Sequence, residues 1–239
     1  MKQFVILSLS LFMFSFGKAH AQAAGRSDSL ARRNTIDLFQ KKLAEHLNIY
    51  NGVEELGYPP DIIGNPYYLY DHLVAGSVTY DGVTYLDVQV QYDMVKDALI
   101  VKYATTPSRI RLLNSRLSSF DLSGHHFVRV TAADSIKNLK EATYDELYSG
   151  TWRLLVLRSA FTQNEIVDRK SFIRIDPKVA YFVLKDRNVF PVRNARQTLK
   201  VVGDKGAIRS YLKKNKFKFR KQKELVLTKI VSYADRKEN

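Results

Sequence analysis

The sequence predicts an α+β protein, in which an antiparallel β meander lies between an N-terminal amphipathic helix and a basic helical C-terminal segment. Through residues 83–92, after Asp81-Gly82, apolar side chains alternate with mixed or polar ones, a period typical of an antiparallel strand with one wet face. Near both ends of the chain, apolar side chains instead recur every three or four residues, as in helices. Tyr (14) and Phe (13) outnumber Gly (11) and Pro (6), which favours packed β-structure with short turns. We expect the sheet to form a sandwich or a partly open barrel.

Residues 1–21 are expected to be a secretory signal peptide. Lys2 precedes an apolar run at residues 4–16, and Ala19-His20-Ala21 has the small-x-small pattern that signal peptidase cleaves, which places the cut before Gln22. The run is shorter than the roughly twenty residues that cross a bilayer. The mature protein is therefore expected to be exported without a transmembrane span, to the periplasm, to the outer-membrane periphery or out of the cell. Because the chain has no cysteine, no disulfide stabilises it.

Residues 22–72 are predicted to hold a helix and an aromatic-rich connection. The sequence "NTIDLFQKKLAEHL", residues 34–47, places Ile36, Phe39, Leu43 and Leu47 on one helical stripe. The following stretch carries an Asn-Gly pair, a Pro-Pro pair and a Gly-Asn-Pro run, each of which interrupts regular structure. We expect an ordered connection that leads into the sheet.

Residues 73–192 are predicted to form the antiparallel sheet. Asp81-Gly82 lies between two β-rich runs, and this pair favours a tight hairpin turn because Gly accepts positive φ freely and Asp tolerates it. Ser123-Gly124 predicts a second turn, and residues 186–188 predict a third within "VAYFVLKDRNVFPV". Further strands are expected at residues 97–103, 109–114, 119–122, 125–131 and 153–158.

Residues 193–239 are predicted to be a basic helical segment packed on the same domain. Ile208, Tyr211 and Leu212 predict one helix, for which Asp204 is a suitable N-cap. A second stripe lies in "KELVLTKIVSYADRKEN". Between the two, in "YLKKNKFKFRKQK", we expect Asn215 to end the first helix, and Phe217 and Phe219 to anchor a short connector while the cations face outward.

Several of these stretches carry a resemblance to a known group of proteins. The series "IYNGVE", "GNPYY" and "GSVTYDGVTYLDVQVQYDMVKD", followed by "YFVLKDRNVFPVRN" and a lysine-rich helical tail, resembles uncharacterised exported proteins of Bacteroidota. The resemblance covers residues 49–233 and implies an exported, β-rich protein with a helical C-terminus. It implies no activity and no catalytic residues.

Positive charge is concentrated in one segment of the chain. The formal net charge is +14, and residues 185–223 hold fourteen Lys or Arg against two Asp. Such a segment attracts polyanions, although it also fits a solvated helix face or an attraction within the protein. Its densest part predicts a binding site for an anion or a partner at Lys213, Lys214, Lys216, Lys218, Arg220, Lys221 and Lys223.

The expected partner is an anionic component of the cell envelope or an acidic protein. Lipid headgroups, lipopolysaccharide and acidic polysaccharide all meet this description, whereas export argues against nucleic acid. We expect a non-enzymatic envelope protein; the alternative is an exported enzyme acting on a cell-wall or carbohydrate substrate.

No catalytic residue, metal ligand set or cofactor is assigned from the sequence. His125 and His126 are adjacent, so on a strand they point to opposite faces and cannot share one ion. Ser210 and Lys213 match Ser-x-x-Lys without its companion motifs. The tyrosines within residues 67–92 suit either a stacking surface for a sugar or peptide, or cross-strand pairs that hold the sheet together.

Overall fold

The structure is a computed structural model that describes Thr35 and residues 47–167, 169–203, 205–219 and 221–238. The expected signal peptide lies outside these residues, as does the expected helix at 34–47 apart from Thr35 and Leu47. Residues 46–239 form one compact unit, and it is this unit that we describe.

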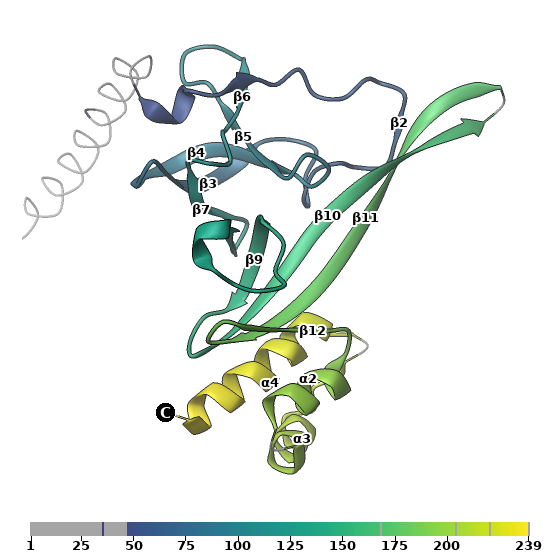
Figure 1. The fold of residues 1–239 in the computed structure, drawn as a ribbon. Coiled ribbons are helices and arrows are strands. Elements are labelled where there is room, and N and C mark those ends of the chain that lie inside the picture. The colour runs from purple at the N-terminus through teal and green to yellow at the C-terminus, as the bar shows by residue number, and fades with distance from the viewer. Residues whose placement is uncertain (1–34, 36–46, 168, 204, 220, 239) are drawn as a thin grey trace, which may run out of the picture. The chain divides into compact units, whose positions relative to one another are not determined.

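Twelve strands form one open sheet, which is antiparallel in all but one pairing (Figure 1). Its order is β1-β6-β5-β4-β3-β7-β8-β9-β10-β11-β12, and β2 pairs with β11 in parallel. The strands are β1 (Val53–Glu54), β2 (Ile62–Ile63), β3 (Val74–Tyr80), β4 (Val83–Asp93), β5 (Ala98–Lys102), β6 (Arg109–Arg111), β7 (Leu117–Leu122), β8 (His125–Val130), β9 (Ala142–Tyr148), β10 (Trp152–Val167), β11 (Lys170–Lys185) and β12 (Asn188–Val192).

The three turns predicted from the sequence are confirmed. Asp81 and Gly82 join β3 to β4 with φ of 51° and 74°, as a type I′ turn requires. Ser123 and Gly124 do the same between β7 and β8, with φ of 51° and 81°. The third turn joins β11 to β12, where Lys185 pairs with Asn188. These contacts are local in sequence, so the turn residues set the pairing next to each turn, although the β3–β4 register shifts farther along, between Gly76 and Val78.

β10 and β11 form a long two-stranded ribbon that projects beyond the rest of the sheet (Figure 1). β9 pairs with β10 only at residues 154–157, and β12 pairs with β11 only at residues 181–185. The outer half of the ribbon is held instead by the start of the unit: Ala160 donates its N–H to the Met94 carbonyl at 2.9 Å, and β2 lies beside Ile173. The sheet therefore curls back so that late strands meet early ones.

The main core lies under β3, β4, β5, β7 and β8. Its largest side chains are aromatic and almost fully buried: Tyr80, Tyr92, Phe120 and Phe127. Phe120 and Phe127 stack with ring centroids 4.6 Å apart. On β4, Val88, Val90 and Tyr92 contact this core as the period of two predicts. The prediction is wrong for Leu86, which is exposed: Asp87 has a φ of 54° at a register shift in the β3–β4 pairing, and Tyr85 contacts the core instead.

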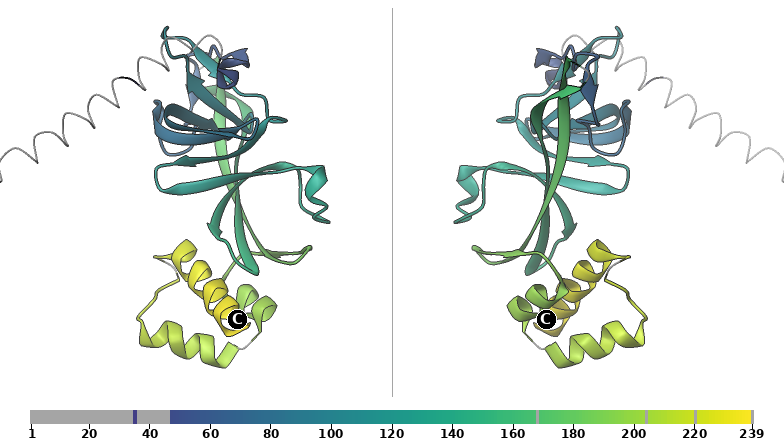
Figure 2. Two further views of the ribbon diagram at one scale, coloured as in Figure 1. Left: turned by 90° about the vertical axis from the view of Figure 1, so that its left-hand side faces the viewer. Right: turned by 90° about the vertical axis from the view of Figure 1, so that its right-hand side faces the viewer.

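Three helices follow the sheet and lie at one end of it: α2 (Ala195–Val202), α3 (Lys205–Lys214) and α4 (Lys223–Glu238) (Figures 1 and 2). α4 packs Leu227 and Val231 against Trp152 and Leu154 of β10. A second cluster joins the helices to one another through Leu199, Ile208, Val226 and Ile230. The predicted α+β class, with a mostly antiparallel open sheet and a helical C-terminus, is confirmed.

Candidate functional site

The strongest functional feature is a group of exposed cations on α2, on the residues just before it, on α3 and on the connector at residues 215–222. Within the described part of the chain, none of these side chains forms an ion pair. We call this group the cationic cap. Its members are Arg193, Arg196, Lys200, Lys205, Arg209, Lys213, Lys214, Lys216, Lys218 and Lys221.

The amphipathic pattern of α3 explains why its cations face outward. Ile208 is fully buried, while Tyr211 and Leu212 are half-buried against the same cluster or its rings. The remaining positions of the helix are largely solvent-facing, and Lys or Arg occupies most of them. Burial of the apolar stripe therefore fixes which way the charges point.

The connector confirms the arrangement expected from "YLKKNKFKFRKQK". Asn215 donates from Nδ2 to the Tyr211 carbonyl at 2.8 Å, and the Phe217 N–H bonds to the Leu212 carbonyl at 3.1 Å. Lys216 adopts φ of 55°, the left-handed conformation that usually selects Gly at a helix C-terminus. Phe217 and Phe219 then pack against the helical core, so the backbone that carries Lys218 is held in place.

The seven predicted site residues differ in their surroundings. Five of them, Lys213, Lys214, Lys216, Lys218 and Lys221, belong to the cationic cap, and Arg220 lies outside the described residues. Lys223 differs because it is half-buried, with Nζ 4.1 Å from the ring centroid of Tyr181. This ammonium makes a cation–π contact within the protein and offers little to a partner.

Two acidic residues of α4, Glu224 and Asp235, form their hydrogen bonds with the sheet and not with the cationic cap. Glu224 accepts hydrogen bonds from the two terminal guanidinium nitrogens of Arg158, Nη1 and Nη2, at 3.1 and 3.0 Å. Asp235 accepts from the Trp152 N–H at 2.9 Å and from the Tyr148 hydroxyl at 2.8 Å. The segment's positive field is therefore not cancelled by these carboxylates.

These contacts also set the pKa values of the two carboxyls. Burial alone would raise the pKa of Glu224, but the hydrogen bonds and charge of Arg158 outweigh it and lower the pKa below its usual value. The Trp152 N–H is the main cause that lowers the pKa of Asp235. Burial and the nearby Glu224 raise the pKa of Tyr181 to about 12. Both carboxyls are thus ionised and committed to internal partners at neutral pH.

Arg158 is the centre of a polar junction that was not predicted from the sequence. Its guanidinium contacts Asp145 on β9 at 2.7 Å as well as Glu224, and it lies 5.0 Å from the Tyr68 ring centroid. His125 reaches the same Asp145 oxygen at 2.8 Å. The other oxygen of Asp145 is buried without a hydrogen-bond partner among the described residues. A sequence signal did exist, since Arg158 interrupts the apolar run of β10.

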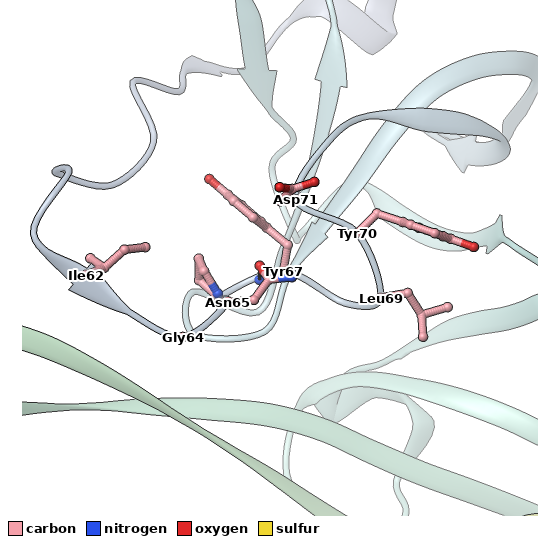
Figure 3. Close-up of a pocket in the computed structure, with 8 residues that line it drawn as sticks. Ile62, Gly64, Asn65, Tyr67, Leu69, Tyr70 and Asp71 are labelled. Carbon is pink, nitrogen blue, oxygen red and sulfur yellow. Dashed lines mark hydrogen bonds between the residues drawn. The ribbon is translucent and has the colours of Figure 1, made fainter.

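A shallow pocket of about 340 Å³ lies along residues 62–71 (Figure 3). Ile62, Tyr67, Leu69 and Tyr70 supply its apolar surface, and Asn65 and Asp71 its polar groups. Leu69 has φ of 61°, and the Tyr70 N–H bonds back to the Tyr68 carbonyl at 2.7 Å. This is a γ-turn of the strained, positive-φ kind, which a leucine side chain rarely adopts.

Most of the tyrosines that suggested a stacking surface have a structural role. Tyr67, Tyr68, Tyr80 and Tyr92 are at most 9% exposed. Only Tyr70, at 39%, presents much of its ring to solvent among those within residues 67–80. The cross-strand and core interpretation therefore holds for the group, and Tyr70 is the exception.

His125 and His126 point to opposite faces, as their adjacency predicts. His125 turns inward to Asp145, and His126 turns outward to Asp121 at 2.6 Å. In the part of the chain that the structure describes, no cluster of His, Asp and Glu is arranged to hold a metal ion. Nor does any helix there have the length and apolar character needed to cross a bilayer.

Comparisons with known proteins add no relative. No family model, curated protein sequence or solved structure matches the chain. We therefore infer function from the chain's own residues.

Proposed function

We propose that this protein is an exported, non-enzymatic component of the cell envelope that binds an anionic surface or partner through its cationic cap. The observation that carries the proposal is the set of exposed Lys and Arg side chains without ion pairs among the described residues. A surface that serves only solubility mixes both charge signs. Here the carboxylates of α4 are engaged elsewhere, with Arg158 and with the backbone at Trp152. The partners that fit are anionic lipid headgroups, lipopolysaccharide, acidic polysaccharide and acidic proteins.

Export is the second part of the proposal and is supported by the signal-peptide pattern at residues 1–21. Processing at the expected site makes Gln22 the first residue of the mature protein. N-terminal sequencing of protein recovered from the envelope fraction measures this directly. Recovery of full-length chain from the cytosol would contradict it.

Charge reversal tests whether the cationic cap binds anionic partners. We expect the variant with Glu at Lys213, Lys214, Lys216, Lys218 and Lys221 to lose binding to anionic vesicles and to immobilised acidic polysaccharide at low salt, because it inverts the local field. Co-sedimentation and column retention measure the loss.

The chain offers a matched control with the same change in net charge. Five exposed lysines lie on or beside the sheet: Lys102, Lys137, Lys140, Lys170 and Lys178. Their reversal to Glu is expected to leave most of the binding intact. An equal loss in both variants would show that only net charge matters, and no binding by the natural sequence at low salt would overturn the proposal.

The alternative, an exported enzyme acting on a cell-wall or carbohydrate substrate, receives less support. A glycoside hydrolase needs two carboxyl groups about 5 to 10 Å apart across its substrate. The pocket at residues 62–71 is lined by one carboxylate, that of Asp71, which is fully exposed to water. The observations thus favour binding over catalysis.

A further inference from the structure

Three cations of the cap lie in one row along α3. Lys205, Arg209 and Lys213 follow one another at intervals of four residues, and all three are exposed. Four residues of α-helix rise about 6 Å, and side chains four apart lie on the same side of a helix. The row therefore presents a positive charge at about every 6 Å along the helix that lies farthest from the sheet (Figure 2).

The row works against the stability of its own helix. Like charges four residues apart repel one another, and no acidic residue occupies the first turn of α3, although Asp204 precedes that turn in the sequence. Lys205, the first residue of the helix, also adds positive charge at the end where the helix dipole is already positive. A bound chain of negative charges would remove each of these unfavourable interactions.

The surroundings of the row favour a ligand in water over a lipid bilayer. In the described part of residues 190–225, the exposed large apolar side chains are Phe190 on β12 and Leu225 on α4, and none lies on α3, while Phe217 and Phe219 pack against the helical core. Interfacial helices bury an apolar face among the lipids, which this segment does not offer.

The aromatic residue of α3 argues against single-stranded nucleic acid. Proteins that bind such strands stack bases on exposed rings. Tyr211 is half-buried, and its ring lies against those of Tyr233 and Phe217, with centroids 5.2 and 6.3 Å away.

We propose that the row of Lys205, Arg209 and Lys213 binds a linear acidic polysaccharide, whose carboxylates repeat along the polymer and lie along α3. This inference rests on the proposed function and makes it narrower. It states that the polymer binds the regularly spaced cations of one helix, α3, whereas the proposed function requires only an excess of positive charge on the cationic cap.

Two triple variants with equal loss of charge separate the inference from the proposed function. The row variant carries Lys205→Gln, Arg209→Gln and Lys213→Gln. The off-row variant carries Lys214→Gln, Lys218→Gln and Lys221→Gln, which change exposed cations of the same cap. Glutamine has nearly the helix propensity of Lys and Arg, so α3 should persist in both.

The probe is polygalacturonate, with monomeric galacturonate at equal carboxylate concentration as its small-ligand control. At low salt we expect the row variant to bind the polymer at least about tenfold more weakly and the off-row variant less than about threefold more weakly, because lost contacts release fewer counterions. The row variant should also melt at a higher temperature without ligand, because its repulsive pairs are gone. That second readout confirms that the variant is folded.

Each of the remaining outcomes contradicts either the inference about the row or the proposed function. If both variants bind the polymer equally weakly, or if monomeric galacturonate binds as tightly as the polymer, the inference about the row is wrong. The proposed function is not affected by either result. Binding to anionic vesicles but not to the polymer also overturns the row and assigns the cap to a membrane surface. If the natural sequence binds neither polymer nor vesicles at low salt, the proposed function fails together with the inference.

Discussion

Arg158 shows how one residue connects the sheet to the helix that carries the cap. Its guanidinium bridges Asp145, which is fully buried, and Glu224 at the start of α4. Burial by itself would lower the pKa of Arg158, yet the hydrogen bonds of Glu224 and the charge of Asp145 raise it above the ordinary value. The cation is thus permanently charged, and it lies between two carboxylates that would otherwise repel each other.

Arg158→Met is expected to destabilise the protein by about 3–5 kcal/mol, because it leaves the buried Asp145 carboxylate without its cation. Chemical denaturation at neutral pH measures the loss. Arg174→Met is the matched control, since Arg174 pairs with Glu165 on the exposed half of the ribbon and such a pair contributes about 1 kcal/mol or less. Similar losses in the two variants would contradict a special role for the junction.

At the scale of the element, α4 is held on the sheet by a carboxylate near each end. Glu224 bonds to Arg158, and Asp235 bonds to Trp152 and Tyr148. Gly150 belongs to this contact, since a Cβ there would collide with the Asp235 carboxylate. Both pKa values are lowered in the folded protein.

Acid should therefore loosen α4. A carboxyl whose pKa is lower in the folded state stabilises the fold above its unfolded pKa, about 4.3 for Glu and 3.9 for Asp, and this contribution disappears as pH falls through the folded pKa. We expect the double variant Glu224→Gln, Asp235→Asn to be less stable at neutral pH but to lose less stability on acidification. Urea midpoints measured across the acid range test this, and an acid loss equal to that of the natural sequence would contradict it.

Elements whose contacts are local in sequence could be predicted, and those with distant partners could not. The hairpins at Asp81-Gly82 and Ser123-Gly124 were predicted because turn chemistry sets them. The outer half of β11 was missed because Pro177 interrupts "SFIRIDPKVAYF". Ala160, which faces Pro177, sends its N–H outward to Met94, so the backbone groups of this pair point away from the partner strand. The proline therefore removes no ladder hydrogen bond, a fact that only the long-range pairing reveals.

At the scale of the whole molecule, the sequence shows where the positive charge is concentrated, but not which charged residues of the C-terminal segment contact the sheet. The count over residues 185–223 predicted the cap, and the apolar stripe of α3 predicted which side of that helix is wet. The inward turn of Glu224 and the cation–π contact of Lys223 depend on β10 and β11, strands distant in sequence. The structure thus removes Lys223 from the candidate site and explains why the cap keeps its field.

The central claim, that the cap binds polyanions by charge, is tested most directly by the salt dependence of binding to polygalacturonate. The logarithm of the association constant should fall linearly with the logarithm of salt concentration, with a slope of about −2 to −4 if three to five cations displace counterions from a flexible chain. The five-site reversal to Glu in the cap should abolish this binding, and the matched reversal on the sheet should preserve it. Binding that is absent at low salt, or that does not change as salt is raised, would contradict the account.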